Sequence, residues 1–149
     1  MNKNEILESP LETIIQTFQH RKPMNCKLWN KVAADKGEDH KDRPLIFAID
    51  FDGTIVEDAF PEIGELKEDA VSFINKVREG GHKWILWTVR TGDHLKKALQ
   101  FLADNNILPD TVNSNVPEAI QFLGEDSRKV YADFYIDDKS VGLKWPNFD

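Results

Sequence analysis

The feature that most restricts the fold of this chain is an alternation of short apolar strands with amphipathic helices. Apolar runs typical of strands buried on both faces occur at residues 45–50 (LIFAID), 83–88 (KWILWT) and 130–137 (VYADFYID). Helical spacing of apolar residues occupies residues 66–81, 92–106 and 117–124, and residues 110–115 form a candidate short strand and loop. The alternation predicts an α/β fold: a Rossmann-like parallel sheet in three layers, with helices on both faces.

Polar side chains follow each of the three confident strands. Asp50 and Asp52 come after the first, Thr88 after the second, and Asp137 and Asp138 after the third. The carboxyl ends of parallel strands lie at one edge of a sheet, so we expect these groups to converge there. Four carboxylates repel one another unless a cation with a preference for oxygen ligands lies between them, and Mg²⁺ fits best. The sequence therefore predicts a magnesium site.

Composition narrows the functional classes. The chain has 149 residues, a net charge of −7 and one cysteine, Cys26. The acidic balance argues against a nucleic-acid surface, and a lone cysteine forms neither an internal disulfide nor a cysteine-based zinc site. No apolar run approaches the roughly 20 residues that span a bilayer, and the polar start is no signal peptide. We expect a cytoplasmic protein with no membrane partner.

The first 43 residues are expected to form a separate segment. A capping pattern from Ser9 and apolar residues on one face predict a short helix, and a polar, lysine-rich connection with Trp29 follows. The helix face must be buried, either on the chain's own sheet or in a homo-oligomer. We therefore predict an N-terminal helix and connection at residues 1–43 and a catalytic domain at residues 44–149.

Three phrases together resemble a known family. DFDGT after a buried strand, a strand ending in Thr88 and a later strand ending in IDD are similar to the haloacid dehalogenase superfamily of phosphohydrolases. The similarity covers residues 44–145, and LWTVRTG and ADFYIDDKSVG resemble its small members without a cap domain. More distantly, ADFYIDD is similar to the end of the deoxyribonucleotidases.

The resemblance implies roles for the residues around the first strand. Asp50 would be the nucleophile that attacks phosphorus and forms an aspartyl-phosphate, and Asp52 would serve as general acid and then as general base. Residues two apart at a strand end point the same way, which fits this pairing. Gly53 would allow a tight turn beneath the phosphate, and the Thr54 hydroxyl would brace that turn. Thr88 would hydrogen-bond a phosphoryl oxygen.

The resemblance also implies the metal ligands. Mg²⁺ would lie between Asp50, the main-chain carbonyl of Asp52 and Asp137, while Asp138 would hold water molecules around the ion.

A cation that neutralises the phosphate is expected, and three residues compete for that role. Arg90 and Lys139 each follow a strand end, and the fork of an arginine suits phosphate oxygens. Lys129 precedes Asp137 by eight residues, which at ~3.3 Å per residue places it about 25 Å away, at the wrong end of the strand. We favour Arg90, with surface cations as the alternative for each.

The interval after the first strand, TIVEDAFPEIGE, is long enough for a flap and too short for a domain. We therefore predict an open site without a cap, and a Mg²⁺-dependent phosphomonoester hydrolase acting on a small phosphorylated substrate. One alternative keeps the chemistry but is a nucleic-acid end phosphatase or nucleotidase. Another is a non-catalytic protein that binds metal or phosphate on the same fold.

Overall fold

The computed structural model of the protein describes residues 44–141. The predicted N-terminal helix and its polar connection lie outside the described residues, so their packing and any role in self-association stay predictions.

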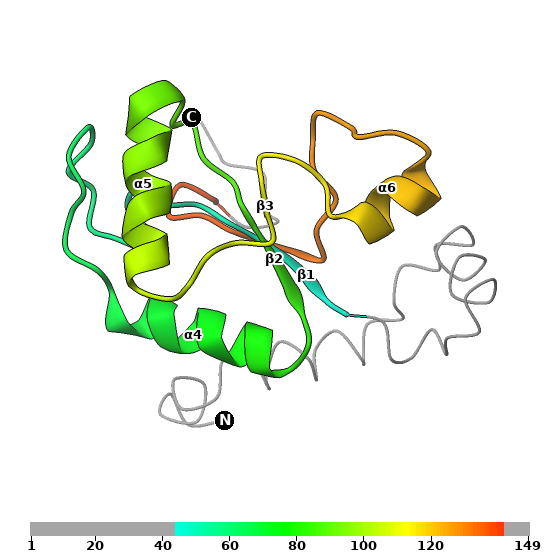
Figure 1. Cartoon of the computed structure of the whole chain (residues 1–149), viewed down its shortest axis with the longest axis horizontal. Coiled ribbons are helices and arrows are strands. Elements are labelled where there is room, and N and C mark those ends of the chain that lie inside the picture. Colours follow the sequence, from blue (N-terminus) through cyan, green and yellow to red (C-terminus); the bar gives the residue numbers. More distant parts are fainter. Residues whose placement is uncertain (1–43, 142–149) are drawn as a thin grey trace, which may run out of the picture.

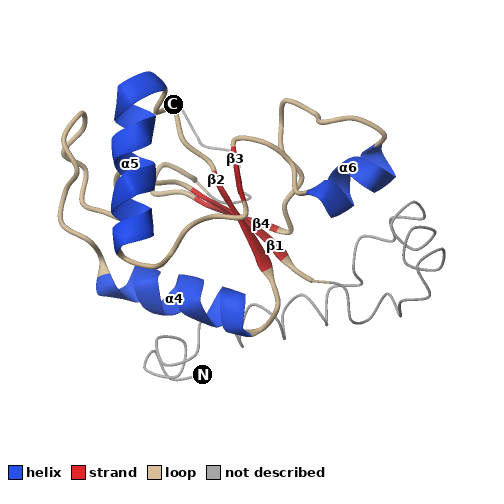
Figure 2. Cartoon of the chain, in the orientation of Figure 1, coloured by secondary structure: helices blue, strands red, loops and turns tan. Residues whose placement is uncertain are grey.

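The described chain alternates strands and helices in the predicted order (Figures 1 and 2). The elements are β1 (Ile46–Ile49), α4 (Glu68–Glu79), β2 (Lys83–Leu86), α5 (Gly92–Asp104), β3 (Thr111–Val112), α6 (Pro117–Leu123) and β4 (Phe134–Ile136). The four strands pair in parallel in the order β3-β2-β1-β4. The predicted α/β fold is confirmed.

The register of the sheet brings the ends of its strands to one edge. Ile49, the last residue of β1, pairs with Leu86 of β2 and with Ile136 of β4. The residues after these three positions therefore leave the sheet side by side. The edge formed by these carboxyl ends is the one where ligands bind in open parallel sheets.

Two apolar cores, one on each face of the sheet, make the fold three-layered. Alternate residues of β1 point to opposite faces: Phe47 and Ile49 belong to one core, and Ile46 and Ala48 to the other. The first core includes buried residues of α4 and α5, and the second includes those of α6, which lies on the other side in Figure 1. The predicted apolar faces of the first two helices line the first core, with the members Leu66, Ala70, Phe73, Ile74, Val77, Leu95, Ala98, Leu99 and Leu102.

The last strand is shorter than the sequence predicts: it begins at Phe134, and side chains take part in the contacts just before it. The Asp133 N–H donates to the Ile46 carbonyl at 2.8 Å. The Asp133 carboxylate accepts the Ile46 N–H at 2.9 Å. The Tyr135 hydroxyl accepts the Ala132 N–H at 3.2 Å and donates to the Val130 carbonyl at 2.6 Å. Val130 and Ala132 are still buried in the second core. The apolar pattern of this segment therefore correctly predicts that these residues are buried, but not that they belong to a strand.

A flap, residues 57–66, stands between β1 and α4 in place of a cap domain. It closes on itself through an antiparallel bridge between Val56 and Leu66 and a 2.8 Å hydrogen bond from the Glu57 N–H to the Glu65 carbonyl. A Cβ on Gly64 would lie 1.9 Å from the Glu57 carbonyl oxygen, so only glycine fits this approach. The flap therefore has a defined shape without containing a helix or a paired strand.

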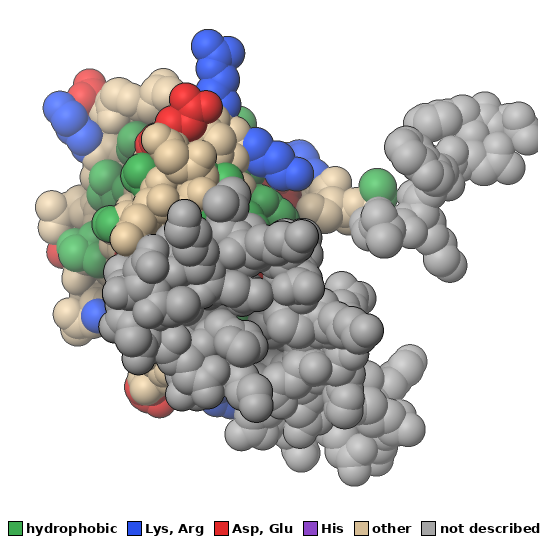
Figure 3. Space-filling view, turned by 90° about the vertical axis from the view of Figure 1, so that its right-hand side faces the viewer, with side chains coloured by type: hydrophobic (Ala, Val, Ile, Leu, Met, Phe, Trp, Pro, Cys, Tyr) green, Lys and Arg blue, Asp and Glu red, His purple; other side chains and the backbone are tan. Residues whose placement is uncertain are grey.

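Where described residues are visible in Figure 3, hydrophobic side chains form separate small patches among polar ones. The large hydrophobic side chains that are exposed are Phe60, Val89, Leu108, Leu123, Tyr135 and Val141. Among residues 44–141, none of the helices combines the length and apolar character required to cross a membrane.

Candidate functional site

Three carboxylates meet at the edge formed by the ends of β1 and β4. Asp50, Asp137 and Asp138 each place one carboxylate oxygen within 4.8 Å of the other two. The Asp50 N–H donates to the Ile136 carbonyl at 2.9 Å, which extends the pairing of β1 with β4 and fixes the two acidic segments side by side. The predicted convergence of these acids is therefore present in the structure.

A tight turn after β1 brings the main chain against the acids. Gly53 has a φ of 85° and donates its N–H to the Val56 carbonyl at 2.8 Å. A Cβ at this position would lie 2.3 Å from a carboxylate oxygen of Asp138. The turn thus requires glycine twice, for the left-handed conformation and for the close approach of Asp138.

Thr54 braces the acidic group from within the same turn. Its hydroxyl donates to Asp50 Oδ2 at 3.1 Å and accepts the Asp138 N–H at 3.0 Å. Asp138 Oδ1 lies 3.4 Å from the same hydroxyl, as a second acceptor for its single proton. Thr54 therefore ties the turn after β1 to the loop after β4.

The three acids affect one another's ionisation. Burial raises the pKa of Asp50 to about 6, with a further increase from the charge of Asp137. Burial also acts to raise the pKa of Asp138, but hydrogen bonds to Asp137 and Asp50 and the nearby charge of Lys139 lower it overall. A proton or a cation is needed to relieve the repulsion within this group.

The donor set of this group fits a hard divalent cation. All three side chains offer carboxylate oxygens, which are the ligands that Mg²⁺ and Ca²⁺ prefer. The raised pKa of Asp50 reflects a half-buried carboxylate whose neighbours supply insufficient positive charge, and a bound cation would provide it. Asp50, Asp137 and Asp138 are therefore the residues of the described chain that could hold Mg²⁺.

Asp52 lies apart from the three acids and binds Arg90. Asp52 Oδ2 accepts from Arg90 Nε and Asp52 Oδ1 accepts from Nη2, both at 2.7 Å, so the pair is bidentate. The Asp52 carboxylate, predicted to converge with the other three, is not in the acidic group found among the described residues. The part of Asp52 left for a metal is its main-chain carbonyl, which is the atom that the family resemblance implies.

Arg90 lies at the predicted edge of the sheet, but its side chain binds protein oxygens there. Its side chain is fully buried, and each of its five N–H groups donates to a protein oxygen. In this arrangement no N–H remains for a phosphoryl oxygen. The predicted contact between Arg90 and phosphate stays a prediction; the partners that the structure gives Arg90 are Asp52, the flap and α5.

Thr88 is held at the predicted edge by the loop after β3. Its main-chain N–H donates to Asn113 Oδ1 at 2.9 Å, and Asn113 Nδ2 donates to the Thr88 carbonyl at 2.8 Å. The Thr88 hydroxyl oxygen accepts the Arg90 N–H at 3.1 Å, so its own proton can be donated elsewhere. Asn113 therefore replaces a strand neighbour and orients Thr88.

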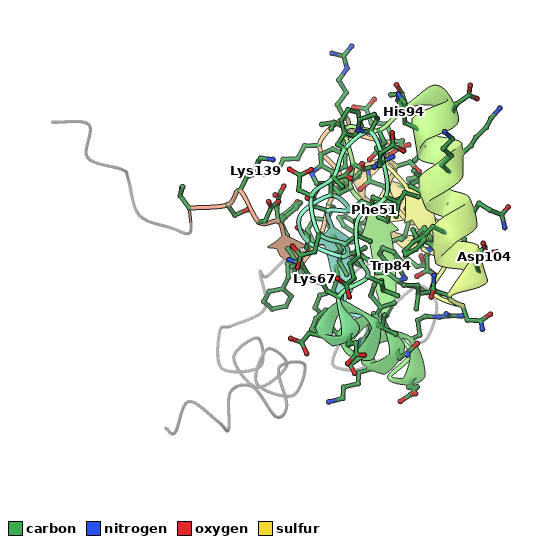
Figure 4. All side chains as sticks on the ribbon, turned by 90° about the vertical axis from the view of Figure 1, so that its left-hand side faces the viewer. Phe51, Lys67, Trp84, His94, Asp104 and Lys139 are labelled. Carbon is green, nitrogen blue, oxygen red and sulfur yellow. The ribbon has the colours of Figure 1, made fainter. Side chains whose placement is uncertain are left out.

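The lysines around the sheet have different surroundings. Lys67, which sequence reasoning missed, donates from Nζ to the Gly53 carbonyl at 3.0 Å. Figure 4 places Lys67 and Lys139 on the side of Phe51 away from α5. Lys129 Nζ lies over the Tyr135 ring at 5.3 Å, and the Tyr135 hydroxyl donates to the Val130 carbonyl. The predicted distance of Lys129 from the acids stays a prediction.

A signal for Lys67 was present in the sequence. The helix after a parallel strand begins at the edge where that strand ends, so a lysine just before the helix lies near the strand-end turn. The three predicted cations, Arg90, Lys139 and Lys129, were instead placed by their positions relative to strands. Lys67 directly precedes α4, and its N–H donates to the Ile55 carbonyl at 2.9 Å.

Comparison with known proteins supports the fold. The chain is similar to a solved structure of a conserved protein coded by a locus of Bacteroides thetaiotaomicron, with 38% sequence identity and a TM-score of 0.59. The match covers 70% of this chain and 84% of that one. The chain thus belongs to the same family as this conserved Bacteroides protein. Neither protein-family models nor curated proteins gave a match to the chain.

Proposed function

We propose that the protein is a Mg²⁺-dependent phosphomonoester hydrolase that acts through an aspartyl-phosphate on Asp50. The observation that carries the proposal is the position of Asp50. It directly follows β1, has a carboxylate oxygen within 4.8 Å of those of Asp137 and Asp138, and has a pKa raised to about 6. A half-buried acid with such neighbours at a sheet edge is a candidate functional group. The resemblance of DFDGT, Thr88 and IDD to phosphohydrolases agrees with this assignment.

The proposed reaction has two steps. In the first, an Asp50 carboxylate oxygen attacks phosphorus, the bond from phosphorus to the leaving oxygen breaks, and the Asp52 carboxyl gives its proton to that oxygen. In the second, water attacks the phosphorus of the aspartyl-phosphate, its proton passes to Asp52, and the bond to Asp50 breaks. Inorganic phosphate is released, and both carboxyl groups return to their starting state.

The metal and the polar side chains would stabilise the charge of the phosphoryl group. Mg²⁺ bound by Asp50 and Asp137, with Asp138 beside it, would offset the negative charge that otherwise keeps an anionic phosphate away from three carboxylates. The Thr88 hydroxyl can donate to a phosphoryl oxygen. Lys67 adds positive charge beside the Gly53 carbonyl and takes the role predicted for Arg90.

The first test is hydrolysis of 4-nitrophenyl phosphate with and without Mg²⁺, with Asp50→Asn as the blank. Activity that requires both the ion and Asp50 would support the proposal. A cytoplasmic location belongs to the same proposal, because the lone cysteine excludes an internal disulfide.

Two further measurements address the two alternatives. Binding of Mg²⁺ without hydrolysis of any phosphate ester would favour the non-catalytic binding protein, which the full occupation of Arg90 makes worth testing. A rate on phosphorylated oligonucleotides that falls steeply with salt would favour the nucleic-acid end phosphatase.

A further inference from the structure

We propose that Arg90 is a positioning residue that holds Asp52 and the flap in one fixed arrangement. The inference rests on the proposed function, because Asp52 is the general acid and base there. Arg90 is 1% exposed, although arginine is among the residues least often found fully buried. An arginine buried at the edge of a candidate site and saturated with partners requires an explanation.

The contact with Asp52 fixes the orientation of its carboxylate. Two parallel N–H···O bonds of 2.7 Å form a fork-to-fork pair, which restrains rotation about the last side-chain bond of Asp52. A carboxylate has about four lone-pair sites, and Arg90 occupies one on each oxygen. Among residues 44–141, only Arg90 donates to these two oxygens, so their remaining sites can exchange a proton with a leaving group or with water. Arg90 thus orients the Asp52 carboxylate and leaves a lone-pair site on each of its oxygens.

The other N–H groups of Arg90 attach this pair to the flap and to α5. Nη1 donates to the Pro61 carbonyl at 3.1 Å, and Nη2 donates to the Glu62 carbonyl at 2.9 Å. Nη1 also donates to the His94 carbonyl in the first turn of α5, at 3.2 Å. Because one rigid guanidinium makes all these bonds, the flap and the Asp52 carboxylate have a common anchor.

Aromatic rings complete the enclosure of the guanidinium. The Arg90 guanidinium carbon lies 5.2 Å from the centre of the Phe51 ring and 5.0 Å from that of Phe60. Phe51 is buried between the strand end and the turn, and Phe60 belongs to the flap. Phe60 also contacts the His94 ring, with centroids 5.5 Å apart. A displacement of the flap would therefore remove cation–π and hydrogen-bonding contacts of Arg90 together.

Fold stability alone does not explain this arrangement. A buried ion pair often contributes no more stability than packed apolar residues of similar volume. A purely structural role predicts that substitution of Arg90 slows every substrate equally. A role through Asp52 predicts a larger loss of rate for an ester whose leaving group must be protonated than for one whose leaving group is stable as an anion.

The test compares kcat/KM for two esters in the full-length protein with Mg²⁺, because kcat/KM reports the first step and not the second, which is the same for both esters. The leaving group of 4-nitrophenyl phosphate departs as a stable phenolate, whereas that of glycerol 2-phosphate must be protonated. Arg90→Lys keeps the charge but cannot form the two parallel bonds. General acid catalysis contributes about 10²–10⁴-fold, so we expect Arg90→Lys to slow the glycerol ester at least ~10-fold more than the nitrophenyl ester.

Two further variants make the comparison specific. Asp52→Asn should show the same difference between the two esters, and the double variant should be no slower than Asp52→Asn alone, because both changes act through one group. Arg78→Lys is the matched control: Arg78 lies on α4, donates to the Asn106 carbonyl and should leave both rates unchanged. Equal slowing of both esters by Arg90→Lys would overturn the proposal.

Amide hydrogen exchange tests the arrangement without activity. We expect flap residues 57–62 to exchange faster in Arg90→Lys and in Asp52→Asn than in the wild type or Arg78→Lys. Should Arg90→Lys fail to fold, Asp52→Asn alone provides this comparison. Unchanged exchange in the flap would refute the anchor. If the wild type hydrolyses neither ester with Mg²⁺, the proposed function is wrong. The hydrogen-exchange result alone would then test whether Arg90 anchors the flap.

Discussion

The two edges of the sheet use the same kinds of side chain for different purposes. At the amino edge, acceptor side chains cap main-chain N–H groups at the beginning of strands. These contacts are Leu45 N–H to His82 Nδ1 (3.0 Å), Ile46 N–H to Asp133 Oδ2 (2.9 Å) and Trp84 N–H to Asp110 Oδ2 (2.9 Å). Each acceptor there has a main-chain donor, which is how buried polar groups are normally satisfied.

At the carboxyl edge, the acids face one another. Asp50 receives one hydroxyl donor from Thr54, while Asp137 and Asp138 lie within the same 4.8 Å group. The pKa of Asp50 is raised to about 6, first by burial and then by Asp137. The type of residue therefore does not separate a structural acid from a functional one. The difference is whether the acid's neighbours are donors or other acids.

Asp50→Asn should have the largest effect of these substitutions, because it removes the proposed nucleophile from the carboxyl edge. Asparagine cannot act as the nucleophile, so we expect hydrolysis of 4-nitrophenyl phosphate to fall at least ~10³-fold, as for loss of a group that acts in both steps. Activity is measured at saturating Mg²⁺ against Asp104→Asn, an exposed acid at the far end of α5. Normal turnover in Asp50→Asn would show that another group is the nucleophile.

The same substitution should stabilise the metal-free protein. The folded pKa of Asp50 is about 6, above the ordinary value of 3.8, so the free energy of unfolding falls as pH rises through that window. Asparagine removes this penalty. Because Asp50 is only partly buried and solvent screens its charge, we reduce the expected gain to about 1–2 kcal/mol at pH 7.5 in EDTA. A lower melting temperature for Asp50→Asn would contradict the account of repulsion at this edge.

Asp137→Asn should weaken Mg²⁺ binding at the same edge without removing the nucleophile. Loss of one carboxylate ligand should raise the Mg²⁺ concentration for half-maximal activity at least ~10-fold, by analogy with the effect of changing groups around a bound metal. Titration of Mg²⁺ in the activity assay measures the shift. An unchanged midpoint would mean that Asp137 does not hold the ion.

The sequence was sufficient to predict the acidic edge, because the parallel-sheet rule depends only on the order of strands and helices. Asp50, Asp137 and Asp138 follow strands that pair, so their convergence is determined by topology. The rule places a residue at an edge without giving the direction of a long side chain. Arg90 was predicted at the correct edge, but whether its side chain bound phosphate or Asp52 depended on the path of the flap.

The remaining differences have the same origin. Lys67 reaches the Gly53 carbonyl because the flap closes between Val56 and Leu66, a contact that no local pattern specifies. The start of β4 at Phe134 is accompanied by side-chain contacts of Asp133 and Tyr135. Local periodicity predicts which residues are buried, whereas side-chain contacts across distant segments determine where strands begin and where charges point.

Asp110→Ala should break one cap at the amino edge and leave the site intact. The buried Trp84 N–H would lose its acceptor, at about 1 kcal/mol of unfolding free energy. Asp110→Asn keeps a carboxamide oxygen at the same place and is the matched control. Urea denaturation measures both variants, and their kcat for 4-nitrophenyl phosphate should equal that of the wild type. A large loss of kcat would mean that the two edges are not independent.

The smallest effect is expected from His82→Asn, which removes the titratable acceptor from the amino edge. His82 Nδ1 accepts the Leu45 N–H, and burial lowers the pKa of His82 while the charge of Asp133 opposes this. As pH falls below 6.5, the unfolded chain binds a proton before the folded one does, so the free energy of unfolding decreases. Asparagine keeps an acceptor and does not titrate. Urea denaturation at pH 7.5 and 5.5 should therefore show a larger loss for the wild type than for His82→Asn. Asp50 contributes to the pH dependence in the opposite direction, but equally in both proteins, so its effect cancels in the comparison. Equal losses of unfolding free energy in the two proteins would mean that His82 binds its proton as readily in the folded protein as in the unfolded chain.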